Sequence, residues 1–210
     1  MEWITRRCLV LVIVIGAAGG VNGQQPAPSP TPDPKTTTTT QTTTPDYVFP
    51  TAEERFKDYV KDTVGPMRLL RTAAAAGIQQ WRDSPEEWGQ GMKGYGKRFA
   101  SGMGRNAIQQ TVTYGLDSAF QLDTGFKRSK RDGFGPRLKD ALLENVTSRN
   151  KSGNRVISAP RFVGIYTGSV IASETWYPDR YSYKDGLRQG TTTLLMGFAY
   201  NVVREFLIKF

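Results

Sequence analysis

The sequence predicts a mostly α-helical protein, a Gly-rich helical bundle over residues 51–210 preceded by a disordered Pro/Thr-rich segment. Three observations support this: dense helix-start signals, apolar residues at helical spacing, and small residues at every fourth position. The chain has 210 residues, with 28 Lys and Arg, 19 Asp and Glu, and no His, which suits one domain with a core. Without His, Ser-His-Asp hydrolysis and His-ligated metal sites are excluded. We expect no metal and no cofactor.

Residues 1–23 are typical of a secretory signal peptide. Arg6 and Arg7 precede an apolar run that begins at Cys8, and Val21 and Gly23 are small residues that suit a cleavage site before Gln24. The alternative is an uncleaved anchor, although the 16 uncharged residues from 8 to 23 fall short of the roughly 20 that span a bilayer. Cleavage would remove the only Cys, so the mature fold cannot use a disulfide.

Residues 24–50 combine prolines with a Thr tract and have almost no apolar side chains before Tyr47. Such a segment cannot form a core, and its proline half should be extended. Two interpretations remain open, a tether that holds the folded part away from a surface and a passive disordered N-terminus.

Sequence patterns typical of helix starts recur along the chain from Thr51 onward. Thr51 and Glu54 form a capping-box pattern, Gly65 ends that helix, and Pro66 can open a second helix that ends near Trp81. Ser84 with Pro85 and Glu87 predicts a third helix through Ala107. The later starts are Gly135-Pro136, the segment 158–160 for a helix to about Ser173, and Ser182 with Asp185 for a helix to Phe206.

The third helix carries an aromatic stripe, Trp88, Tyr95 and Phe99, with small residues beside it. Such a stripe is more often core than a ligand site, whereas small residues four apart let two helices approach closely. Whether this packing lies inside one domain, between subunits of a homo-oligomer or in lipid stays open. The predicted helix-packing residues are Gly96, Ala100, Gly104, Gly164, Gly168, Ala172, Gly190 and Gly197.

A basic run follows the third helix. Its cations are Lys127, Arg128, Lys130 and Arg131, and nearby glycines indicate an exposed loop. Such a loop can contact an anionic lipid surface. Nucleic acid would suit the net charge of +9 but not the export signal, so we expect no nucleic-acid partner.

Several segments resemble a group of uncharacterised exported bacterial envelope proteins with no assigned activity. The resemblance covers about residues 80–206, in Trp88-Gly89-Gln90-Gly91, 95–99, 161–172, 176–179 and 201–206. It implies an export signal, a Gly-rich helix containing Trp and Tyr, and a terminal helix. A His that follows the Gly-rich helix in such proteins is replaced here by Gln121-Leu122-Asp123.

Together these patterns predict a non-enzymatic protein of the periplasm or cell envelope. We expect it to associate with a membrane face or an envelope protein through its glycine- and aromatic-lined helices. The alternative is a soluble periplasmic enzyme or binding protein that uses carboxylates such as Glu86, Glu87 or Asp123, since paired carboxylates can hydrolyse glycosides without His.

Overall fold

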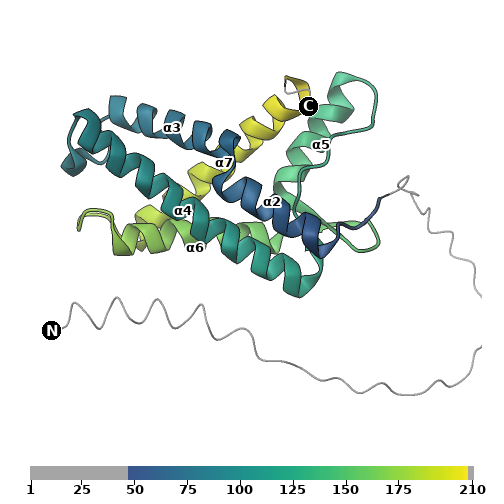
Figure 1. The fold of residues 1–210 in the computed structure, drawn as a ribbon. Coiled ribbons are helices and arrows are strands. Elements are labelled where there is room, and N and C mark those ends of the chain that lie inside the picture. The colour runs from purple at the N-terminus through teal and green to yellow at the C-terminus, as the bar shows by residue number, and fades with distance from the viewer. Residues whose placement is uncertain (1–46, 208–210) are drawn as a thin grey trace, which may run out of the picture. The chain divides into compact units, whose positions relative to one another are not determined.

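The computed structural model describes residues 47–207, and within this range the protein is mostly helical, as predicted (Figure 1). The predicted signal peptide and nearly all of the predicted linker lie outside the described residues. The helices are α2 (Ala52–Val64), α3 (Pro66–Trp81), α4 (Gly91–Phe120), α5 (Phe134–Val146), α6 (Ala159–Thr175) and α7 (Tyr183–Phe206), with a short 3-10 helix η1 (Glu86–Trp88).

Helix α4 is the centre of the arrangement. It has 30 residues and packs along α6, with α2 and α3 also lying against it. Helix α7 packs on α6 and on α5, so the order of contact runs from α3 through α4 and α6 to α7 and α5 (Figure 1).

The predicted helix starts at Thr51, Pro66 and Ser182 are confirmed. The Thr51 backbone N–H donates to Glu54 Oε2 at 2.8 Å, and the Ser182 backbone N–H donates to Asp185 Oδ2 at 3.0 Å. Both pairs form capping boxes, which satisfy the free donors of the first turn.

The predicted helix start at Ser84 is wrong. Only Glu86–Trp88 form a short 3-10 turn, and α4 begins at Gly91. Gly89 and Gly91 have φ of 68° and 78°, a conformation that is easy for glycine and interrupts a continuous helix. Trp88 therefore lies outside α4.

A small antiparallel sheet, not predicted from the sequence, joins α4 to α6. Its strands are β1 (Leu122–Asp123), β2 (Thr147–Asn150) and β3 (Arg155–Ile157) in the order β1-β2-β3, with Asp123 opposite Arg149 and Ser148 opposite Val156. The Tyr47 hydroxyl donates to Asp123 Oδ2 at 2.7 Å. Tyr47, which precedes the predicted helical domain, is thus held against the sheet.

The interior is built mainly from small and polar side chains. Its buried hydrophobic residues are Ala76, Ala141, Ile165, Ala172 and Tyr177, three of them alanines. Buried polar groups are held by hydrogen bonds: the Arg98 side chain donates to the carbonyl oxygens of Ser84, Pro85 and Gly89. Many of the larger apolar side chains are exposed on the outside of the helices, among them Leu70, Ile78 and Trp81.

Candidate docking surface

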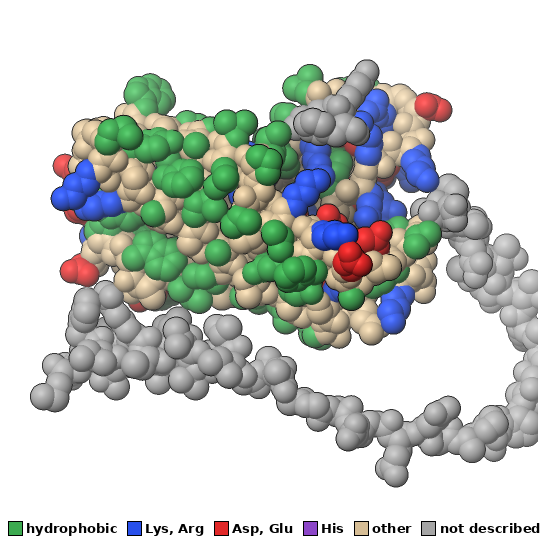
Figure 2. Space-filling view, viewed as in Figure 1, with side chains coloured by type: hydrophobic (Ala, Val, Ile, Leu, Met, Phe, Trp, Pro, Cys, Tyr) green, Lys and Arg blue, Asp and Glu red, His purple; other side chains and the backbone are tan. Residues whose placement is uncertain are grey.

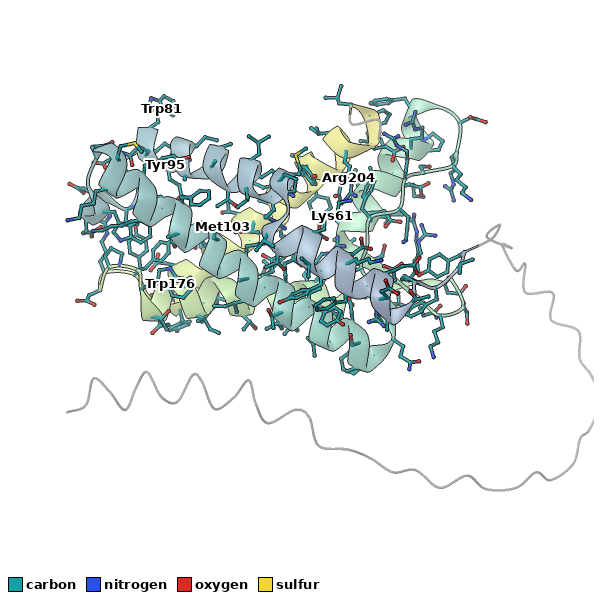
Figure 3. All side chains as sticks on the ribbon, in the orientation of Figure 1. Lys61, Trp81, Tyr95, Met103, Trp176 and Arg204 are labelled. Carbon is teal, nitrogen blue, oxygen red and sulfur yellow. The ribbon has the colours of Figure 1, made fainter. Side chains whose placement is uncertain are left out.

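The outer side of α3 carries an apolar stripe. Met67, Leu70, Ala74, Ile78 and Trp81 recur at steps of three and four, and all five are exposed, Trp81 to 86 % and Leu70 to 64 %. This spacing places them on one face of the helix. Figure 3 shows Trp81 pointing away from the fold.

Helix α7 meets α3 at one point and extends this surface. The Arg71 guanidinium of α3 lies 3.6 Å from the centre of the Tyr200 ring of α7, and the two helices cross in Figure 1. Met196 and Val203, one turn on either side of Tyr200, are exposed. We call Met67, Leu70, Ile78 and Trp81 with Met196 and Val203 the α3–α7 face.

The two helix segments that carry the α3–α7 face contain cationic residues and no acidic ones, and a carboxylate, Asp83, comes just after α3. Residues 66–82 include Arg68, Arg71 and Arg82, residues 186–204 include Arg188 and Arg204, and neither range contains Asp or Glu. Burial, with the neighbouring Arg71, lowers the pKa of Arg68 to about 10, so this guanidinium stays charged at neutral pH. Hydrophobic side chains gather over α3 and the adjoining part of α4, whereas Lys and Arg gather toward the end of the molecule that contains α5 (Figure 2).

The small residues of α6 and α7 bring helices together within the domain. A Cβ on Gly164 would lie 2.7 Å from the Gln109 carbonyl oxygen, and one on Gly168 would lie 2.8 Å from that of Arg105. Gly190 lies against the Tyr166 ring, Gly197 lies against the Asn145 side chain, and Ala172 is fully buried. These contacts are intramolecular, one of the three settings that the sequence left open.

The small residues of α4 differ from the prediction. A Cβ on Gly96 would meet nothing within 4 Å, and Ala100 is exposed, so at these two positions the helix does not pack on another element. Gly104 makes an ordinary contact with the Trp176 ring at 3.6 Å. The tight positions of α4 are instead Gly94, against Gly89, and Gly102, against Thr72.

The predicted aromatic residues are divided between internal contacts. Trp88 packs on Tyr177 with ring centres 4.9 Å apart, while Tyr95 stacks on Phe99 and donates its hydroxyl to the Ala73 carbonyl oxygen. Tyr95 points into the space between α3 and α4 (Figure 3). These three residues therefore do not form one exposed stripe.

The basic loop is largely engaged within the fold. Lys127 pairs with Asp123 at 3.2 Å, Arg131 lies 3.6 Å from Asp140, and Arg128 donates to the Arg204 and Glu205 carbonyl oxygens. Lys130 is exposed. The loop thus holds the end of α7 to the rest of the domain, and most of its charge is not directed at an outside surface.

The three carboxylates of the alternative interpretation lie in different settings. Glu86 and Glu87 face Arg180, at 3.9 Å and 2.8 Å. Asp123 accepts hydrogen bonds from Tyr47 and the Gly125 backbone N–H. Among residues 47–207, no group of three acidic or Cys side chains is placed to hold a metal ion.

Most of the α3–α7 face was not predicted from the sequence, although the helix that ends near Trp81 was. Two signals were present: apolar residues at 67, 70, 74, 78 and 81, and the absence of acidic residues from 66 to 82. The contribution of α7 depends on its contact with α3, which no local pattern encodes.

The comparisons with known proteins give no match: no family model, curated protein or solved structure is similar to the chain. Within residues 47–207 none of the helices combines the length and apolar character that crossing a membrane requires.

Proposed function

We propose that the protein is an exported, non-enzymatic protein of the bacterial cell envelope that docks on an anionic membrane surface through the α3–α7 face. The observation that carries the proposal is the pairing of two exposed apolar helix stripes with cationic residues and no acidic ones. Helices that lie in a membrane interface combine Leu and Trp on one face with Lys or Arg beside them. The signal-peptide pattern and the resemblance to exported bacterial proteins support the location.

The interior supports a surface role. Buried positions are filled by Ala, Ser, Thr and hydrogen-bonded charges, while Leu70, Ile78 and Trp81 face outward. Exposed apolar patches mark interaction sites when they are continuous. Lipid is the preferred occupant because Arg82 at the end of α3 and Arg188 of α7 are exposed and match anionic headgroups.

The test uses the protein without residues 1–23, mixed with phosphatidylcholine vesicles with or without phosphatidylglycerol and then sedimented. We expect the parent to sediment with the anionic vesicles and to be only partly released by 1 M salt, where the Debye length is about 3 Å. Leu70→Ser and Ile78→Ser should each reduce partitioning about tenfold, because each removes an apolar side chain that lipid would cover. Ile157→Ser is the matched control, since Ile157 is 76 % exposed on β3, outside the α3–α7 face.

Two results would overturn the proposal. One is a parent protein that stays in the supernatant with anionic vesicles. The other is equal binding by the parent and the two α3 variants. Recovery of the protein from envelope extracts only in a lipid-free complex with another protein would also reject lipid as the occupant.

A further inference from the structure

A second feature of the fold, separate from the α3–α7 face, is an acidic hollow between α2 and α4. Asp58 and Asp62, one turn apart on α2, form one wall, and Tyr114 and Asp117 of α4 form the other. Asp123 of β1 lies at its edge. Its volume is about 70 Å³, several times what one water needs.

Asp117 is one of two buried acidic groups that line this hollow, the other being Asp123. The Asp117 side chain is only 7 % exposed. Oδ2 accepts a hydrogen bond from Thr124 Oγ1 at 2.5 Å, whereas Oδ1 is buried and has no hydrogen-bond partner. A buried carboxylate oxygen without a donor is costly, so a donor supplied from outside the chain would complete this site.

Aromatic rings stand next to these carboxylates. Tyr59 and Tyr114 stack with ring centres 4.9 Å apart and an interplanar angle of 30°, and both line the hollow. Ring faces attract organic cations, and carboxylates accept charge-assisted hydrogen bonds from N–H groups. The hollow therefore offers both contacts that an ammonium group prefers.

The charges that face Asp117 come from three other elements. Arg55, Asp58 and Asp62 belong to α2, Asp123 to β1 and Arg161 to α6, while Asp117 itself belongs to α4. Arg55 donates a hydrogen bond to the Ser118 hydroxyl, and Arg161 donates to the carbonyl oxygens of Thr124 and Glu144. Neither guanidinium donates to Asp117 Oδ1.

From this geometry we infer that the hollow binds the ammonium group of a small primary amine, with Asp117 Oδ1 accepting its hydrogen bond and Tyr59 and Tyr114 beside its carbon atoms. Burial raises the pKa of Asp117 to about 6, and nearby Asp123 also raises it. A cation at Oδ1 stabilises the charged form of this buried carboxylate. Binding therefore strengthens as the pH rises above about 6.

The test is an NMR titration of the protein without residues 1–23 with n-butylamine, near pH 7.5, with 1-butanol as the uncharged analogue. We expect saturable shifts at the Thr113, Thr124 and Gly125 amides with butylamine and none with 1-butanol. Asp117→Asn keeps the shape but loses the charge, and it should weaken binding at least tenfold. Asp132→Asn is the matched control, because Asp132 is an exposed carboxylate outside the hollow.

The site would be rejected if the parent gives no saturable shifts, if 1-butanol gives the same shifts, or if Asp117→Asn binds like the parent. Calcium chloride producing the same shifts at the same amides would indicate a metal site and would also overturn the inference. Asp117→Asn must retain the parent's dispersed amide spectrum. If this variant unfolds, Asp58→Asn on the exposed wall tests the same site, with a smaller expected loss.

Discussion

The Asp117 carboxyl group shows how one buried residue can oppose folding. Its pKa rises from 3.8 in the unfolded chain to about 6 in the fold, chiefly because burial disfavours the charged form. The folded state therefore holds this proton more tightly than the unfolded state. Stability is lost as the pH rises from about 4 to 6, and the full cost is present above about 6.

Asp117→Asn should remove that cost. We expect the free energy of unfolding near pH 7.5 to increase by up to about 3 kcal/mol, since each pKa unit corresponds to about 1.4 kcal/mol. Below about pH 4 the carboxyl is protonated in both states, so the variant and the parent should differ little. Urea unfolding across this range measures both values. A difference that does not change with pH would contradict the assignment.

Close contact between α4 and α6 depends on single glycines. A Cβ on Gly164 would overlap Thr113 Oγ1 and the Gln109 carbonyl oxygen, and backbone cannot move as easily as a flexible side chain.

Gly164→Ala should therefore lower the free energy of unfolding by about 1–3 kcal/mol, the usual cost of overpacking. Gly96→Ala is the matched control in an open helical position, where it should raise stability by up to about 1 kcal/mol through helix propensity. Thermal unfolding followed by circular dichroism measures both. Changes of the same sign in the two variants would show that the α4–α6 contact is not as described.

Helix boundaries were predictable where a local pair defines them. Thr51 with Glu54, and Ser182 with Asp185, each need only one turn of chain, and both boxes form. Ser84-Pro85 gave a similar signal, but the positive φ of Gly89 and Gly91 moved the start of α4 to residue 91. The strands and the acidic hollow were not predictable, because they depend on contacts between residues far apart, such as Asp123 with Arg149.

At the scale of the whole molecule, ion pairs join segments that small side chains cannot hold alone. Glu205 is only 1 % exposed at the end of α7, and its carboxylate accepts from Arg137 of α5 at 2.8 Å and from the Ser129 backbone N–H. Asp140 and Glu144 similarly pair with Arg155 of β3. The sheet, α5 and α7 are therefore connected through buried charge.

Arg137→Ala should be strongly destabilising. It leaves the Glu205 carboxylate buried with less compensation, a change that typically costs about 3–5 kcal/mol. Lys139→Ala, at an exposed position two residues away on α5, should change stability by no more than about 0.5 kcal/mol. Chemical denaturation measures both variants, and equal effects would mean that the Arg137–Glu205 pair does not hold α7 in place.

The position of Trp81 gives the protein a built-in optical reporter. Trp88 stacks on Tyr177, and the Trp176 indole donates to Ser101 at 2.8 Å, so the emission of these two rings is set by fixed neighbours. Trp81 is surrounded by water and should emit at long wavelength and be readily quenched by acrylamide. Any apolar medium that covers the end of α3 would shift this emission toward the blue, and Trp81→Phe would remove the shift without altering the emission of Trp88 or Trp176.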